Sequence, residues 1–289
     1  MTVIGEGTLN QKKLNDQLAA NQPAWMEINL KNAAFNLKCL QRNLGEQVKI
    51  MPVVKADAYG HGALAVSRVF ERCGAMGLAV ANVAEGVELR KAGISLPIYV
   101  LEHLLPEESE QVVEYDLSPV VHSMELARKL SIEGRVRQKT VHVQVRVDTG
   151  SGIMGLHPDK VLPLLREIKG LSWLALVGIF THLTAAYDCE YALVSEQLDL
   201  FERTVQLSLT EDLEVPLVHA ASSPVILCFP EAHFNIVRPG TLPCGKNRET
   251  GRNKRISIRL TLMKAFCNLF EFKTISINKQ QNTKIYRRC

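Results

Sequence analysis

The sequence predicts an α/β fold, a (β/α)8 TIM barrel, from two observations. Short apolar runs rich in valine and isoleucine alternate with amphipathic segments from about residue 48 to residue 240, and there are eight such runs. Short runs that are apolar throughout are typical of parallel strands buried on both faces. The alternation fits either a barrel or an open doubly wound sheet, and the count of eight favours the barrel.

The predicted strands span residues 48–54, 77–81, 97–101, 118–121, 141–147, 174–181, 216–220 and 234–238. Helical patterns lie between them, such as those over residues 62–74 and 83–93. The second of these patterns ends on Gly93. A glycine just past a helix supplies the left-handed conformation that terminates it.

The charge of the chain is divided between two unlike parts. The formal net charge is +4 over 289 residues. Residues 246–289 hold 12 basic and 2 acidic residues, a net charge of +10, whereas residues 1–245 hold 22 basic and 28 acidic residues, a net charge of −6. We therefore expect a polar N-terminal extension over residues 1–23, the barrel over residues 24–245, and a basic, atypical and poorly ordered tail over residues 246–289.

The composition excludes several classes of protein. With 46% hydrophobic and 22% charged residues, the chain can bury a large core, so wholesale disorder is excluded. Its seven cysteines are scattered without a C-x-x-C pair, which predicts reduced thiols in a cytoplasmic protein and no metal site. The most apolar long run, Leu171 to Leu183, is too short to span a bilayer, and the N-terminus lacks the apolar core of a signal peptide. We expect neither a membrane nor a nucleic acid as partner.

Polar residues follow the predicted strands at their carboxyl ends, where a barrel carries its active site. Lys55 closes the first strand. A lysine buried in apolar surroundings has a lowered pKa and becomes nucleophilic, as a Schiff-base amine must. Taken alone, a lysine that emerges into solvent at the end of a strand is the simpler interpretation.

Four later strands also end in polar residues, and together they favour a functional role for Lys55 over the simpler interpretation. They supply Asp148, His182, the segment from His219 to Ser223, and the turn Arg238-Pro239-Gly240. Serines and an Arg-Pro-Gly turn after strands seven and eight are suited to hold a phosphate on hydroxyl and backbone N–H groups. A Schiff-base lysine with a phosphate site on a barrel indicates pyridoxal 5′-phosphate (PLP). Each residue also has an ordinary alternative, as a histidine of the core or a serine that caps a helix.

Six segments of the chain resemble the alanine racemase family, in the family's order and spacing over residues 24–245. They are AWMEINLKNAAFNLKCL (24–40), PVVKADAYGHG (52–62), VRVDTGSGIMGL (145–156), GIFTHL (178–183), HAASSPVIL (219–227) and VRPGTLPCG (237–245). PVVKADAYGHG is highly specific, because it is the family's complete cofactor-lysine motif. The resemblance implies a PLP-binding barrel followed by a mostly β domain. It also implies a head-to-tail homodimer that interconverts L-alanine and D-alanine in the cytoplasm and supplies D-alanine for peptidoglycan.

The resemblance further implies roles for individual residues. Lys55 would bind PLP covalently and act as the base for one face of the α-carbon. Arg238 would pair with the pyridine nitrogen, His182 would lie against the ring, and His219 would support Arg238. The phosphate would be held by Tyr59, Ser223, Gly240 and Thr241. The residues that would surround these groups are Ser222, Arg146 and Asp148.

Two positions depart from the family's pattern. Ile153 stands where the family usually has an arginine that reaches the cofactor's phenolic oxygen and orients the groups around the substrate carboxylate. Isoleucine offers neither a donor nor a charge. Arg146 stands where the family often has a lysine, sometimes carbamylated, and an arginine cannot be modified in this way. These changes predict that cofactor binding is retained and turnover is impaired.

The 44 residues after Gly245 are too few for the family's β domain, which supplies the catalytic tyrosine for the opposite face. They also lack the valines and turn residues that such a domain needs. Three interpretations of this tail stay open, in order of preference: a translation in a shifted reading frame, a solvated terminus, and a patch for nucleic acid or anionic membrane. Three hypotheses of function follow. They are a PLP-dependent alanine racemase, a PLP-binding barrel that is inactive or carries the cofactor, and a non-catalytic fragment with a basic interaction tail.

Overall fold

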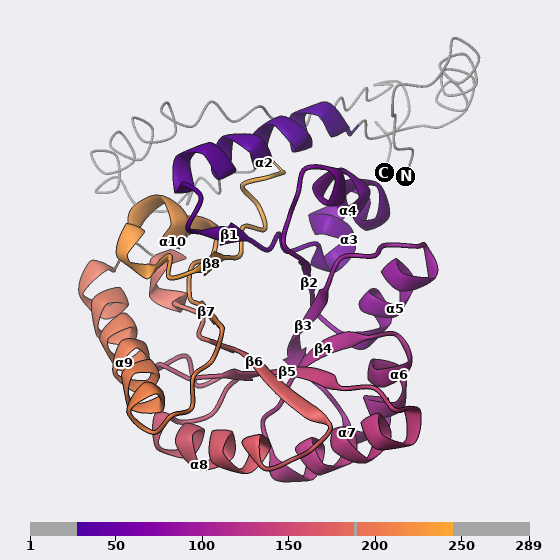
Figure 1. Ribbon diagram of the computed structural model, residues 1–289. Coiled ribbons are helices and arrows are strands. Elements are labelled where there is room, and N and C mark those ends of the chain that lie inside the picture. Colours follow the sequence, from indigo (N-terminus) through magenta and orange to yellow (C-terminus); the bar gives the residue numbers. More distant parts are fainter. Residues whose placement is uncertain (1–27, 188–189, 245–289) are drawn as a thin grey trace, which may run out of the picture.

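Eight parallel strands form a closed ring in the computed structural model, which describes residues 28–187 and 190–244 (Figure 1). The strands are β1 (Lys49–Ile50), β2 (Leu78–Val80), β3 (Ile98–His103), β4 (Leu117–Val120), β5 (Val141–Arg146), β6 (Leu174–Phe180), β7 (Leu217–His219) and β8 (Ile236–Val237). Strands β2 to β7 form one sheet in sequence order, and β1 pairs with β8. Two single bridges, Val53 to Ala79 and Ser222 to Arg238, join this pair to β2 and to the segment after β7. The predicted (β/α)8 barrel is confirmed.

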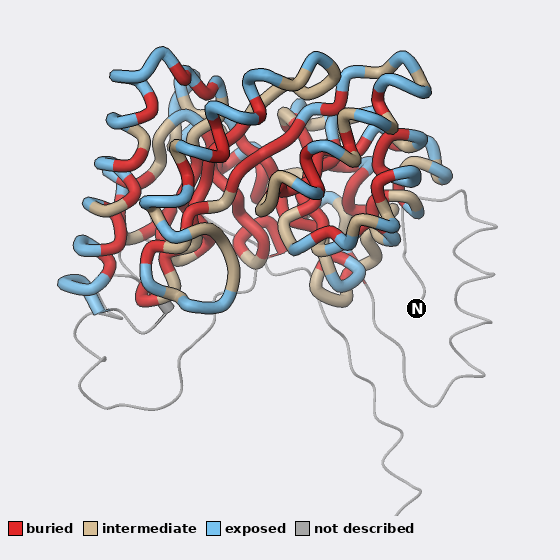
Figure 2. Tube along the Cα trace, turned by 90° about the horizontal axis from the view of Figure 1, so that it is seen from below, coloured by how far each residue is buried: buried red, intermediate tan, exposed pale blue. Residues whose placement is uncertain are grey.

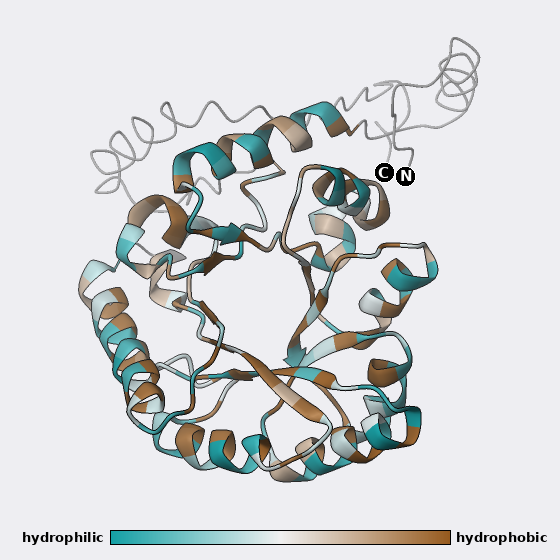
Figure 3. Cartoon of the chain, in the orientation of Figure 1, coloured by the Kyte–Doolittle hydropathy of each residue, from teal (hydrophilic) through white to brown (hydrophobic). Residues whose placement is uncertain are grey.

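Helices cover the outside of the ring between successive strands (Figure 1). They are α2 (Leu30–Leu44), α3 (Lys55–Gly60), α4 (Ala63–Arg72), α5 (Val83–Lys91), α6 (Ser109–Glu114), α7 (Met124–Arg137), α8 (Pro158–Lys169), α9 (Tyr191–Thr210) and α10 (Ser223–Cys228), with short 3-10 turns at Pro106–Glu108, Thr184–Tyr187 and Pro230–Ala232. Apolar residues of these helices face the strands and polar residues face outward (Figure 3). The main core therefore lies in the layer between helices and strands, as the burial of the chain also shows (Figure 2).

Local sequence signals account for the ends of helix α5. Asn82 caps its start, because the side-chain oxygen accepts a hydrogen bond from the backbone N–H of Glu85 at 3.1 Å. At its end Gly93 has φ +84°, and the N–H groups of Gly93 and Ile94 bond to the carbonyls of Arg90 and Leu89. This pair of bonds is a Schellman motif. The predicted role of Gly93 as the terminating residue is confirmed.

Strand residues alternate between two apolar clusters. Ile50, Leu78, Ile98 and Val237 belong to the main core under the helices. Their neighbours along the strands form a second, smaller cluster with Val53, namely Met51, Ala79, Tyr99 and Ile236. Because successive side chains of a strand point to opposite faces, this second cluster fills the inside of the ring. The barrel is thus packed on both faces of its sheet.

Helix α2 links the first and last described parts of the chain. It lies outside the ring beside β1 and β8 (Figure 1), and the Asn36 side chain donates a hydrogen bond to the carbonyl of Pro243 at 3.1 Å. Residues 1–27 and 245–289 lie outside the described residues, so the predicted boundaries of the extension, barrel and tail stay predictions. In the part of the chain that the structure describes, no helix is long and apolar enough to cross a membrane.

Candidate active site

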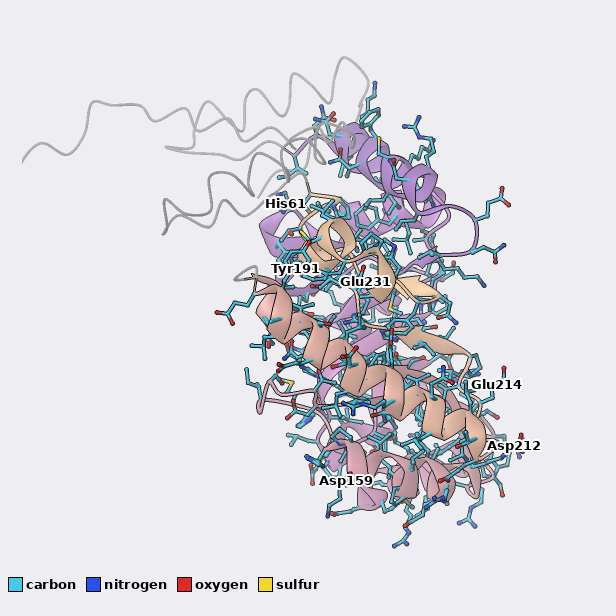
Figure 4. All side chains as sticks on the ribbon, turned by 90° about the vertical axis from the view of Figure 1, so that its left-hand side faces the viewer. His61, Asp159, Tyr191, Asp212, Glu214 and Glu231 are labelled. Atoms are coloured by element: carbon cyan, nitrogen blue, oxygen red, sulfur yellow. The ribbon has the colours of Figure 1, made fainter. Side chains whose placement is uncertain are left out.

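The predicted site residues gather at one end of the barrel, the carboxyl ends of the strands. Lys55 follows β1, His182 follows β6, and Ser222 and Ser223 follow β7. The segment from Arg238 to Thr241 follows β8, where the Ser222–Arg238 bridge aligns the two segments. Helix α9 begins at Tyr191, at the end of the molecule that also carries His61, and stops at Thr210, just before Asp212 at the opposite end (Figure 4).

The segment after Lys55 makes a left-handed turn without glycine. Ala56 to Tyr59 have φ between +51° and +55°, a conformation that costs roughly 1–2 kcal/mol for each L-residue. Neighbouring carboxylates hold the turn. Glu85 accepts a hydrogen bond from the N–H of Ala56 at 2.8 Å, and Asp57 accepts one from the N–H of Ala63 at 2.7 Å. Strain of this kind persists where the surroundings fix it, and functional sites are common places for it.

Lys55 agrees with the simpler interpretation of its position, a lysine that reaches solvent at the end of a strand. Its ammonium forms an ion pair with Glu102, with 3.2 Å between Nζ and Oε1. Both side chains are partly open to solvent, with exposed fractions of 38% for Lys55 and 37% for Glu102. Strand β3 runs to His103, two residues past its predicted end, and this extension places Glu102 opposite the lysine.

Backbone N–H groups after β8 converge on one hydroxyl oxygen. Ser223 Oγ accepts hydrogen bonds from the N–H groups of Gly240, Thr241 and Leu242 at 3.0, 3.1 and 3.3 Å. A Cβ at Gly240 would collide with the hydroxyl of Tyr59, so only glycine fits beside this phenol. Three N–H groups aimed at one point are suited to a phosphate or another anion.

Ser222 departs from the helix-cap alternative. It occupies the position before helix α10, but its side chain makes no capping hydrogen bond. Its Oγ is buried and has no hydrogen-bond partner among the described residues. Because buried hydroxyls normally have a partner, this atom indicates a ligand that approaches the loop after β7.

A buried network supports the Arg238 guanidinium. Arg238 donates hydrogen bonds to Nδ1 of His219, to the carbonyl of Thr181 at 2.7 Å and to the carbonyl of Ala220 at 3.3 Å. Since Nδ1 of His219 accepts, its Nε2 carries the proton and donates to Gln144 Oε1 at 2.9 Å. Burial first, and then the nearby Arg238 charge, hold the pKa of His219 well below its usual value, so the ring is neutral.

His182 is neutral in a positively charged setting. Burial first, and then the charges of Arg238, Arg146 and Lys55, lower its pKa to about 3. The three cations come from the end of β5 and from the segments after β1 and β8, and their fields meet at His182. This end of the barrel therefore favours anionic ligands.

Arg146 and Asp148 lie at the end of β5. The Arg146 guanidinium is 6.0 Å from the centre of the Phe180 ring, and its Nη1 contacts Met154 Sδ at 3.4 Å. Asp148 instead organises the loop that follows, because its carboxylate accepts hydrogen bonds from the N–H groups of Gly150, Ser151 and Gly152. The Ile153 side chain on this loop is 74% exposed.

Sequence reasoning missed two residues that complete the site. Gln144 sits within an apolar run, and its one signal was a polar side chain at a position that a parallel sheet buries. Gly178 on the adjacent strand makes room for it, since a Cβ there would lie 2.9 Å from the Gln144 side chain. Glu102 directly follows the predicted strand over residues 97–101, so the strand-end position that singled out Lys55 was the signal available for it.

Comparison with known proteins gives one consistent result. Residues 28–247 match the family described as the N-terminal domain of alanine racemase. Alanine racemases of Halothermothrix orenii and Carboxydothermus hydrogenoformans are each 36% identical to the chain, over 78% of it and over 59% and 61% of their own lengths. The solved alanine racemase of Clostridium difficile in complex with cycloserine superposes with a TM-score of 0.77 at 32% identity, over 81% of this chain and 65% of that one. The chain therefore spans about three fifths of the length of these curated relatives.

Proposed function

Because the chain belongs to the alanine racemase family, we propose that it binds PLP at the carboxyl end of its barrel and interconverts L-alanine and D-alanine. The observation that carries the proposal is the convergence of Lys55, the Ser223 loop and Arg238 on one end of the ring. Each supplies a different group that PLP requires, namely an amine, a phosphate site and a partner for the pyridine nitrogen.

The residues at this end of the barrel fit the cofactor. The N–H groups of Gly240 to Leu242 converge on one oxygen, and Ser222 Oγ is buried without a partner among the described residues, which suits a phosphate between the loops after β7 and β8. Tyr59, held against Gly240 by the left-handed turn, would border the same site. Lys55 would form the covalent link through Nζ.

The charge state of the Arg238 network has a chemical consequence. His219 is neutral and accepts from Arg238, so the guanidinium keeps its charge and its proton. An arginine beside the pyridine nitrogen is too weak an acid to protonate it. When bound, PLP would supply the electron-withdrawing system that makes the α-proton of alanine acidic. Lys55 Nζ would accept the proton from one face or deliver it to that face, and inversion would require a second group that serves the opposite face. His182, which is neutral, would pack beside the ring without adding charge.

A second candidate is a PLP-binding barrel with little or no turnover. Ile153 favours it, since the side chain points to solvent with 74% of its surface exposed and offers no polar group where the resemblance predicts an arginine. Activity with alanine, supply of D-alanine for peptidoglycan, a cytoplasmic location and a homodimer are all parts of the proposal. We expect racemisation by this chain to be weak.

Absorbance spectroscopy of the full chain with added PLP tests the proposal. We expect a visible band that borohydride fixes covalently, that Lys55→Ala abolishes and that Lys160→Ala, at an exposed lysine on α8, leaves intact. A folded parent chain without the band would overturn both candidates. Formation of D-alanine from L-alanine then separates the racemase from the cofactor carrier, because only the racemase produces it.

A further inference from the structure

The guanidinium of Arg146 lacks an oxygen acceptor among the described residues. It ends strand β5 at the mouth of the barrel and is half-buried. Its Nε is buried without a hydrogen-bond partner among the described residues, and its Nη1 lies 3.4 Å from the thioether sulfur of Met154. A thioether is a weak acceptor, and an unpaired buried donor on a charged group is costly.

Other arginines of the same barrel are satisfied by oxygen atoms. Arg90 donates to the carbonyls of Tyr115, Ile94, Leu96 and Asp116. Arg137 and Arg166 bond to carboxylates. Arg146 differs from these residues in having no oxygen acceptor among the described residues. It also lies at the mouth of the barrel, among the groups of the site.

The two carboxylates that act on the charge of Arg146 have other hydrogen-bond partners. Both Asp148 and Glu102 stabilise its positive charge electrostatically. However, Asp148 accepts from the N–H groups of the loop over residues 150–152, and Glu102 is paired with Lys55. Arg146 therefore has long-range attraction but no direct anionic partner in the described part of the chain. Its charge is available to a ligand.

The position of Arg146 indicates which anion it would bind. The phosphate site lies at the loops after β7 and β8, whereas Arg146 is on β5, so the phosphate has other partners. Arg146 and Arg238 both lie over the Phe180 ring, at 6.0 Å and 5.1 Å from its centre. Arg146 also shares a charged neighbour with Lys55, because Glu102 pairs with Lys55 Nζ at 3.2 Å and attracts the Arg146 guanidinium. An anion bound by Arg146 would therefore lie near the reacting amine.

We propose, on the basis of the PLP-dependent function above, that Arg146 binds the α-carboxylate of the amino-acid substrate. The planar guanidinium presents paired N–H groups that match a carboxylate in a bidentate manner. The exposed Ile153 side chain cannot supply such a contact. Arg146, at the end of β5, would supply the positive charge instead. Arg146 would select amino acids over simple amines.

Isothermal titration calorimetry of propionate into the PLP-loaded full chain tests this assignment. Propionate has the carboxylate of alanine without its amine. We expect Arg146→Met to weaken propionate binding about tenfold or more, the size of a lost charge-assisted hydrogen bond. Arg146→Lys should retain part of the affinity. Arg128→Met, at an exposed arginine of α7, should leave it unchanged.

The cofactor absorbance of the same samples distinguishes the two ways of failing. A parent chain without the visible band defeats the proposed function and this assignment with it. A normal band with no measurable propionate binding in the parent, or with equal affinity in Arg146→Met, defeats the assignment alone. Loss of the band in Arg146→Met also overturns it, because the arginine would then serve the cofactor rather than the carboxylate.

Discussion

The Arg238 guanidinium donates a hydrogen bond to Nδ1 of His219, so the proton of this imidazole resides on Nε2. That proton is directed to Gln144 Oε1 at 2.9 Å. The three residues come from β5, from β7 and from the segment after β8, and all three are buried. Arg238 and Gln144 together therefore fix the tautomer of His219, and the neutral imidazole leaves the proton and the charge on Arg238.

Replacing Gln144 with leucine should destabilise the protein. The substitution leaves His219 Nε2–H buried without an acceptor, at a cost of about 1 to 3 kcal/mol in the free energy of unfolding. Urea denaturation measures the change. Gln111→Leu, at an exposed position on α6, is the matched control and should change the stability little. Equal effects of the two variants would contradict the network.

Replacing Ala56 with glycine should stabilise the protein. Ala56 has φ +51° and is exposed, and glycine adopts this conformation without steric cost, so we expect a gain of about 0.5 to 1 kcal/mol. The control is Ala34→Gly within helix α2, which should lose about 0.5 to 1 kcal/mol. Urea midpoints of both variants give the signs. A loss of stability in Ala56→Gly would show that the turn is not left-handed in solution.

Adding a methyl group at Gly240 should disturb the site through Tyr59. The Tyr59 hydroxyl occupies the space that a Cβ would need, and overpacking of this kind costs about 1 to 3 kcal/mol. We expect Gly240→Ala to lower both stability and PLP affinity. In a Tyr59→Ala background the same substitution should cost clearly less, because the colliding atoms are gone. Strictly additive effects in this double-mutant cycle would contradict the contact.

Replacing His182 with phenylalanine should reduce the loss of stability in acid. The pKa of His182 is about 3 in the folded protein against about 6.5 when unfolded, so the unfolded chain binds the extra proton between these values. Stability contributed by the neutral ring is present above pH 6.5 and falls as the pH drops toward 3. Between pH 7 and pH 5 we expect His182→Phe to lose roughly 2 kcal/mol less than the parent. Urea unfolding curves of both proteins at pH 7 and pH 5 measure this difference. Equal losses of stability in the parent and in His182→Phe would contradict the lowered pKa of His182.

Strands and strand-end residues were predictable because a parallel barrel buries its strands on both faces. Continuous apolar runs such as residues 174–181 then stand out from the amphipathic helices around them. In a barrel the carboxyl ends of all the strands lie at the same end, so the polar residues that follow the apolar runs gather there. Lys55, His182 and Arg238 could be placed in this way.

Other features carry no local signal. Alanine and tyrosine rarely adopt the left-handed conformation of residues 56–59. The turn is held by a hydrogen bond from the N–H of Ala56 to Glu85, 29 residues away, and by a local one from the N–H of Ala63 to Asp57. The partners of Gln144 and Glu102 lie 75 and 47 residues away in the sequence, and strand-end patterns do not report such pairings. The outward direction of Ile153 goes with a loop that Asp148 organises through local hydrogen bonds, and the apolar character of isoleucine did not predict it.

The pairing of β1 with β8 over two residues joins the beginning of the barrel to its end. A ribosome releases β8 last among the described strands, so until then a nascent chain exposes the unpaired edges of β1 and β7, where other chains can add. Lys55 and the Gly240 segment continue directly from the two strands of this seam. A ligand that bound both segments would stabilise the pairing of β1 with β8, and so would favour the closed barrel over open chains that can aggregate.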